Sequence, residues 1–166
     1  MPDVPAPPGG DARFADADAD RPLAIRAEDA RDLAVLAALA QDAVLTAADM
    51  AWDARARRLS LLVSRFRWED AEAARAEGRP FERVRALLVI GDVLRLRHDG
   101  IDRDDPGTVL SLLSLAWQPG PDGTGTLMLQ FAGDGTVAVE AECISVDLRD
   151  VARPHRAVAG EIPRHD

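Results

Sequence analysis

The sequence has few of the residues on which cross-links and covalent chemistry depend. One of its 166 residues is cysteine, while lysine, asparagine and tyrosine are absent, so all 20 basic residues are arginines. A single cysteine excludes a disulfide framework within the chain, which is typical of proteins from reducing compartments. Codon usage in a GC-rich genome would remove lysine without any functional pressure, so the arginine content alone predicts no binding activity.

Long apolar runs and targeting signals are also missing. The longest uninterrupted apolar run ends at Ala40 and is far shorter than the ~18 residues that a membrane span needs. The first residues contain neither a basic region nor an apolar stretch, so no signal peptide is expected. We therefore expect a cytoplasmic protein that does not associate with a membrane.

What the chain has is a folded composition with an uneven charge. Hydrophobic residues make up 47% of it, which is too many for a disordered chain, and 166 residues suit one domain. The net charge of −9 argues against a general nucleic-acid binder. The charge divides into −6 for residues 1–49, +4 for residues 50–98 and −7 for residues 99–166, so a basic middle lies between acidic ends.

The composition changes along the chain predict three regions. Residues 1–21 are rich in Pro, Gly, Ala and Asp and are expected to be a disordered acidic tail. Residues 22–150 are expected to form a single globular α+β domain, and residues 151–166, which lack periodicity, a partly mobile C-terminal tail. The acidic tail could also mask the arginine-rich middle of the chain.

The clearest element is a helix over residues 28–45. Its apolar residues recur at steps of three and four, and Asp29 is a suitable N-cap because its carboxylate can accept from free backbone amides. The acidic segment Glu69–Glu77 has a helical composition and stop signals after it, so it is either a short helix or a polar excursion.

Period-two alternation predicts about seven strands, mostly joined by hairpins. They cover residues 50–52, 59–68, 81–90, 93–98, 109–117, 127–131 and 137–148. We expect a bulge near Leu61–Val63, inward-facing Leu94 and Leu96, and burial of strand 109–117 on both faces. Asp134-Gly135 predicts a tight hairpin, and strand 137–148 must bend at Cys143 because its apolar parity changes there.

These elements predict an α+β fold in which an N-terminal helix packs on a strongly curved, mostly antiparallel sheet or a partly closed barrel. The absence of alternating strand–helix units excludes a doubly wound nucleotide-binding fold. No feature of the sequence specifies an oligomeric state.

Several short words of the sequence occur together in a characteristic order. They are LAQDAVL (39–45), MAW (50–52), RFRWE (65–69), FERV (81–84), VLSLLSL (109–115), FAG (131–133) and ECI (142–144). From about residue 22 onward the chain resembles a bacterial family defined only as domain of unknown function 2948. The resemblance implies a small stand-alone cytoplasmic protein and no particular activity.

Catalytic residues are not indicated. A nucleophilic cysteine needs a base beside it, but Cys143 lies on the apolar parity of its strand, so we interpret it as a core residue. Of the three histidines, only His98 borders the strand core. If the chain were a small-ligand carrier or an enzyme instead, Cys143, His98 and Trp117 would be the residues of its pocket.

Metal and cofactor sites are not indicated either. The acidic loop His98–Gly107 does not have the ligand spacing of an EF-hand and is interpreted as a solvated turn. Two G-x-G sequences, at residues 123–125 and 133–135, precede strands rather than helices and are interpreted as hairpin glycines. We expect neither a bound metal nor a cofactor. Glu140 and Glu142 share a face and are expected to pair with arginines of a neighbouring strand.

The best binding candidates are arginines on predicted strands. They are Arg65, Arg67, Arg83, Arg85, Arg95 and Arg97. Alternation places each pair on one face, and neighbouring strands would gather the guanidinium groups, which suit carboxylates and phosphates. Three interpretations remain: a face that pairs with the protein's own acids, a docking site for an acidic protein, and a site for single-stranded nucleic acid. The last is disfavoured because Phe66 and Trp68 would point to the core.

The sequence thus predicts a non-enzymatic binding or protein-interaction module with an arginine-rich sheet face and an acidic protein as its partner. The alternatives are a small-ligand carrier or enzyme that uses the interior of the sheet near Cys143, and a weak binder of single-stranded nucleic acid.

Overall fold

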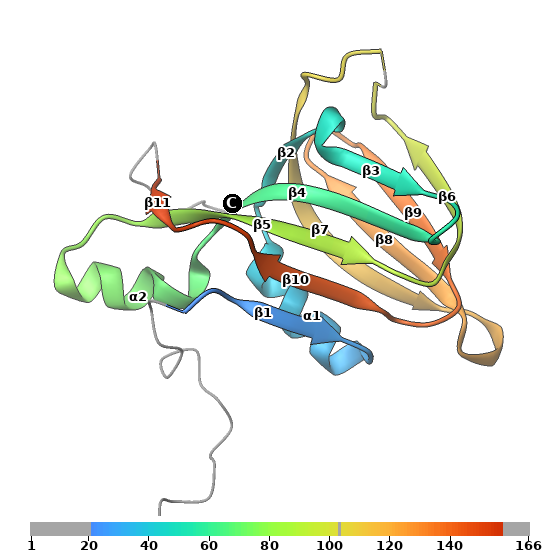
Figure 1. The fold of residues 1–166 in the computed structure, drawn as a ribbon, viewed down its shortest axis with the longest axis horizontal. Coiled ribbons are helices and arrows are strands. Elements are labelled where there is room, and N and C mark those ends of the chain that lie inside the picture. The colour runs from blue at the N-terminus through green and yellow to red at the C-terminus, as the bar shows by residue number, and fades with distance from the viewer. Residues whose placement is uncertain (1–20, 103, 158–166) are drawn as a thin grey trace, which may run out of the picture.

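The computed structural model describes residues 21–102 and 104–157, which form one open antiparallel sheet with two α-helices (Figure 1). The acidic tail expected over residues 1–21 therefore lies outside the described residues, apart from Arg21. The α+β fold and the antiparallel sheet are confirmed, but the sheet has 11 strands rather than about seven. The missed strands are short, and an alternating pattern needs more residues to become visible.

The elements follow one another in this order: β1 (Ala24–Ala27), α1 (Ala30–Ala40), β2 (Val44–Thr46), the 3-10 helix η2 (Ala47–Asp49), β3 (Met50–Asp53), β4 (Arg58–Phe66), α2 (Trp68–Glu77), β5 (Glu82–Ile90), β6 (Val93–Asp99), β7 (Val109–Pro119), the 3-10 helix η3 (Pro121–Gly123), β8 (Gly125–Phe131), β9 (Thr136–Ala141), β10 (Val146–Asp150) and β11 (His155–Arg156). The sheet order is β1-β10-β5-β4-β2-β7-β8-β9-β6, with β3 beside β4 and β11 beside β5.

The sheet bends where two long stretches of chain are each interrupted. The first stretch consists of β5 and β6, and the second of β9 and β10. On one side of the bend β5 pairs with β10, and on the other side β6 pairs with β9. The breaks in the two strands lie side by side, because Gly91 N donates to Ser145 O at 2.9 Å and Glu142 N to Asp92 O at 3.0 Å. The bend expected at Cys143 is confirmed, since this residue lies in the break between β9 and β10. The sheet thereby folds back on itself around its core (Figure 1).

Helix α1 packs against β1, β7 and β4 and contributes buried Leu33, Leu36 and Leu39 to the core. The Asp29 N-cap is confirmed, because its carboxylate accepts from Asp32 N at 2.8 Å. The expected range of 28–45 is too long, since the helix ends at Ala40 and the chain continues into β2. Strand β1 precedes the helix, which is therefore not the first element. No helix among the described residues is long and apolar enough to cross a membrane.

Strand β4 differs from the expectation in a way that matters for function. No bulge interrupts it near Leu61–Val63, since its pairing with β5 runs continuously from Leu59 to Phe66. The buried parity continues through Val63 to Arg65, which is 0% exposed. The bulge prediction rests on the apolar residues changing parity toward Phe66 and Trp68, but the strand ends at Phe66 and both Arg65 and Phe66 are buried. The strand then ends, and Trp68 begins α2, so the helical interpretation of segment 69–77 is confirmed.

Two other expectations about burial are wrong because of shifts in register. Leu94 is 52% exposed, since the β6–β9 pairing shifts between Val93 and Arg95. Strand β7 is buried on one face only, and its pairing with β8 shifts between Leu112 and Ser114. The hairpin at Asp134-Gly135 is confirmed by the pairing of β8 with β9.

Candidate functional site

Arg65 lies inside the protein and is bound on two sides by carboxylates. Its Nε and Nη2 donate to Asp150 at 2.9 and 3.0 Å, and its Nη1 and Nη2 donate to Glu69 at 2.9 and 2.7 Å. Burial alone would lower the pKa of Arg65, but the hydrogen bonds to Glu69 and Asp150 outweigh it, so this pKa is raised. The guanidinium group therefore ties β4 to α2 and β10 instead of facing a partner.

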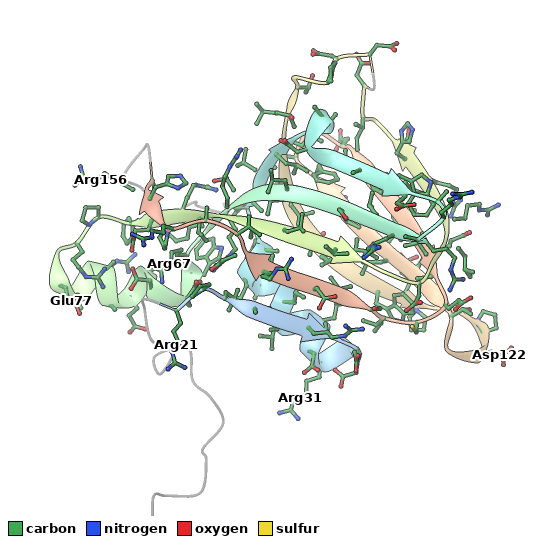
Figure 2. All side chains as sticks on the ribbon, viewed as in Figure 1. Arg21, Arg31, Arg67, Glu77, Asp122 and Arg156 are labelled. Atoms are coloured by element: carbon green, nitrogen blue, oxygen red, sulfur yellow. The ribbon has the colours of Figure 1, made fainter. Side chains whose placement is uncertain are left out.

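Arg67 is similarly enclosed and only 5% exposed. Its Nη1 donates to Glu82 Oε1 at 2.8 Å, and Asp70 lies 3.7 Å from the same nitrogen. Figure 2 shows Arg67 between α2 and the end of the sheet where β11 lies. The prediction that Arg65 and Arg67 line a solvent-facing surface is therefore wrong, because the helix that follows β4 supplies carboxylates that enclose them.

The other predicted arginines lie on separate parts of the fold. Half-buried Arg83 donates to Ser64 O at 2.9 Å, and burial lowers its pKa. On β6, Arg95 donates to Glu140 at 2.8 and 3.2 Å, and Arg97 lies 3.5 Å from the same carboxylate. The six arginines therefore do not form one surface. Arg95 and Arg97 are exposed on β6, and Arg85 is exposed on the outside of β5.

The pairing expected for Glu140 and Glu142 with arginines of a neighbouring strand is confirmed for Glu140, whereas the partner of Glu142 lies in the turn before β4. Glu140 accepts from Arg95 of the adjacent strand, and Glu142 accepts from Arg57 at 2.7 Å. Hydrogen bonds from these arginines lower the pKa of both glutamates. The two carboxylates consequently serve as surface ion-pair partners, an arrangement that does not separate their pKa values as acid–base catalysis requires.

A different set of arginines surrounds a shallow depression on the outer face of the sheet, which we call the arginine groove. Its volume is about 440 Å³, and its lining residues are Ala24, Ile25, Arg26, Arg58, Leu87, Val89, Asp147, Leu148 and Arg149. Arg149 lies opposite Leu87 in the ladder, and Arg85 lies two residues before Leu87 on the same face. The groove therefore has an aliphatic centre with arginines around it.

The charges in the arginine groove are only partly compensated. Arg26 donates to Glu28 at 2.8 Å. By contrast, Arg58, Arg85 and Arg149 are exposed, and the described residues place no carboxylate within ion-pair distance of them. Sequence reasoning missed Arg58 and Arg149. Arg58 precedes buried Leu59, and Arg149 follows buried Leu148, so both arginines face outward. They come together only because β5 lies between β4 and β10 in the sheet.

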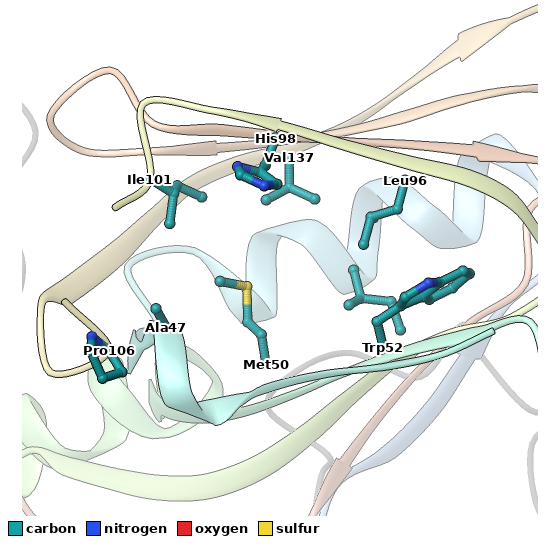
Figure 3. A pocket seen from close by; sticks show the side chains of 9 residues that line it. Ala47, Met50, Trp52, Leu96, His98, Ile101, Pro106 and Val137 are labelled. Carbon is teal, nitrogen blue, oxygen red and sulfur yellow. The ribbon is translucent and has the colours of Figure 1, made fainter. Parts of the chain in front are cut away.

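A second hollow, which we call the apolar cleft, lies where the two halves of the sheet separate. Its volume is about 160 Å³, and it is lined by Ala47, Met50, Trp52, Leu59, Leu96, His98, Ile101, Pro106 and Val137. In Figure 3, Met50 and Trp52 of β3 face Leu96 and His98 of β6 across the hollow. Of the three expected pocket residues, His98 lines this cleft, whereas Cys143 and Trp117 do not.

Cys143 is exposed in the corner between β9 and β10, so its interpretation as a core residue is wrong. The residue lies in the bend, where alternation no longer decides which face is buried. Its Sγ donates to Asp92 Oδ2 at 3.4 Å. Partial desolvation and then the Asp92 carboxylate raise the pKa of the thiol, which disfavours the nucleophilic thiolate.

Alkylation of Cys143 by iodoacetamide should therefore be slower at pH 8 than that of an unstructured cysteine peptide. Replacing Asp92 with Asn should lower the thiol pKa and raise the rate several-fold, because a carboxylate no longer opposes ionisation. The rate measured from pH 7 to 10 reports this pKa. A rate in D92N equal to that of the wild type would contradict the assigned cause.

The described residues hold no group of three or more His, Cys, Asp or Glu side chains placed to bind a metal ion. Nor do they leave a buried side-chain nitrogen or oxygen without a hydrogen-bond partner. The buried polar groups of the described residues are thus engaged in holding the fold, and the arginine groove and the apolar cleft are two hollows with binding potential.

Comparison with known proteins identifies a family. A family model described as "Protein of unknown function (DUF2948)" matches residues 23–165, nearly the whole chain, which confirms the resemblance seen in the sequence. No curated protein and no solved structure matches.

Proposed function

Because the chain belongs to DUF2948, a family of proteins of unknown function, we propose its role from its surfaces: a non-enzymatic, cytoplasmic binding module that docks an acidic segment of a partner protein in the arginine groove. The observation that carries the proposal is the set of exposed Arg58, Arg85 and Arg149, which have no carboxylate of the described residues within ion-pair distance. The one carboxylate in the lining, that of Asp147, lies 3.9 Å from Arg26 Nη1. The chain as a whole has a net charge of −9, so this basic area differs in sign from the rest of the protein. A positive area of this kind attracts an acidic ligand.

The spacing of the arginines suits an extended acidic segment. Arg85 and Arg149 lie on neighbouring strands and are offset by two residues, so their Cα atoms are ~8 Å apart from standard strand geometry. Carboxylates two residues apart on an extended peptide are separated by about 7 Å. Each guanidinium group can then meet one carboxylate, while Leu87, which lies opposite Arg149 and two residues from Arg85, supplies apolar contact.

Protein is favoured over single-stranded nucleic acid as the partner. Bases stack on exposed aromatic side chains, yet Phe66 is buried and its ring centroid lies 4.6 Å from that of Trp68. The Trp68 indole Nε1 donates to Gln41 O at 2.9 Å. The lining of the arginine groove is aliphatic instead of aromatic, which suits a peptide.

A labelled Asp-Ala-Asp-Ala-Asp peptide tests the proposal by fluorescence anisotropy on the full chain. Replacing Arg85 and Arg149 together with Gln should weaken binding roughly three- to tenfold, the sum expected for two exposed ion pairs. Arg31→Gln is the matched control, because Arg31 projects from α1 away from the sheet (Figure 2). Binding should weaken with added salt and vanish for the Asn-Ala-Asn-Ala-Asn peptide.

The chain's own Asp16, Asp18 and Asp20 have the same spacing and are the rival occupant. If replacing these three with Asn strengthens peptide binding, the acidic segment competes for the arginine groove. Equal affinity of the wild type and the Arg85/Arg149 double variant for the peptide would refute the proposed docking surface.

A further inference from the structure

We propose that the apolar cleft binds a small ligand consisting of a single aromatic ring with one oxygen that accepts a hydrogen bond. This site is separate from the arginine groove, since the two share no lining residue. The proposal therefore does not depend on the docking of an acidic partner.

The cleft lies between two walls made by strands, and Ile101 and Pro106 of the segment between β6 and β7 complete its lining. Met50 and Trp52 lie opposite Leu61 and Leu59 in the β3–β4 ladder, so their side chains share the core-facing side of that sheet. The opposite wall comes from β6 and β9, where His98 is paired with Val137. Within the described chain, β3 pairs only with β4 and β6 only with β9, so no strand closes the space between them.

The size of the cleft matches a single ring. Its volume of about 160 Å³ is close to that of an engineered apolar cavity of ~150 Å³ known to hold benzene. Unlike such a cavity, it opens to solvent beside Trp52, which is 40% exposed. A ligand can therefore enter without unfolding of the surrounding strands, and its polar group can remain near the surface.

The lining specifies the chemistry of the ligand. The Trp52 indole offers a flat face for stacking, and the Met50 thioether makes favourable contacts with aromatic rings. His98 is the ionisable residue of the lining, and its imidazole has an N–H donor in either protonation state. An oxygen on the ring can accept from that donor. An aliphatic ligand would leave the stacking face unused, and an aromatic hydrocarbon would leave the donor unused.

Benzoate, phenol and toluene are the probes, tested with the full chain by ligand-observed NMR and by quenching of tryptophan fluorescence. Benzoate and phenol should bind saturably, and His98→Ala should weaken both about three- to tenfold while leaving toluene within twofold. Ala47→Phe should reduce binding of all three at least tenfold by filling the cleft. Leu94→Ala is the control, because Leu94 is an exposed residue of β6, the strand of His98, and does not line the cleft.

Thermal melting of each variant establishes that it is folded, and Leu96→Phe replaces Ala47→Phe as the filling variant if the latter unfolds. Absence of saturable binding of all three probes up to ~10 mM would overturn the proposal. So would binding that the folded filling variant leaves unchanged, since the ring would then lie elsewhere. Equal losses for toluene and phenol in His98→Ala would overturn the role of the oxygen.

Discussion

Arg65→Met is expected to lower the free energy of unfolding by about 3–5 kcal/mol, the loss typical of removing one partner from a buried ion pair. Methionine fills much of the space of the arginine stem, so the cavity is small. The loss arises from Glu69 and Asp150, whose side chains are 9% and 5% exposed and would remain charged without Arg65. Glu69 would keep only the more distant Arg67, at 3.7 Å. Chemical denaturation measures it as a lower midpoint with an unchanged m-value.

Two comparisons separate this cause from simple loss of packing. Arg95→Met removes an exposed ion pair and should change stability by less than about 1 kcal/mol. The triple variant Arg65→Met, Glu69→Gln, Asp150→Asn removes Arg65 together with both of its carboxylates. Arg67 beside it keeps its pairs with Asp70 and Glu82, so the triple variant should recover at least about half of the loss. A triple variant no more stable than Arg65→Met would contradict the electrostatic explanation.

The fate of Arg65 illustrates what sequence reasoning could and could not predict. Strand β4 was identified by its alternating leucines, and its buried parity extends to Arg65. Placing an arginine there requires carboxylates, and one of them, on Asp150, lies 85 residues away along the chain. Local patterns carry no information about such a partner, so the outward face was the natural assignment for an isolated charged residue.

The same limit applies to the candidate sites. Arg58 and Arg149 each stand beside a buried leucine, so their outward direction follows from alternation. Their convergence follows only from β5 lying between β4 and β10. The corner at Cys143 was predictable because the apolar parity changes there, whereas the exposure of its thiol was not, since a bend suspends the alternation from which burial is read.

The apolar cleft shows how a local pattern and a global arrangement combine. His98 was singled out because it borders a strand, and the structure places it in the lining. For Met50 and Trp52 the sequence predicts only a short strand. Met50 and Trp52 lie across from Leu96 because the sheet bends between β5 and β6 and so brings β6 opposite β3. That bend lies where both strands are interrupted, at Gly91 and at Ser145. Hairpin signals alone do not encode that turn.

A second large loss of stability is expected from replacing Gly125, because the hydrogen of this glycine fits where a methyl group cannot. A Cβ at this position would lie 2.6 Å from the Gln118 carbonyl oxygen and would also overlap the Trp117 indole. The carbonyl belongs to the backbone of β7, which pairs with β8 here, so it cannot move without disturbing the ladder. The indole is a side chain of the same strand and would have to turn away as well. Gly125→Ala should therefore cost roughly 1–3 kcal/mol of unfolding free energy.

Gly107→Ala is the matched control for Gly125→Ala, since its Cβ would meet only Asp105 Oδ1 at 3.8 Å, an ordinary contact. It should change stability by less than about 0.5 kcal/mol. Adding Trp117→Val to Gly125→Ala removes the overlap with the ring but not the one with the carbonyl, so the two substitutions together should cost less than the sum of their separate losses. Strict additivity in this double-mutant cycle, measured by chemical denaturation, would show that the indole does not exclude the methyl group and that the clash with the backbone alone selects glycine at the start of β8.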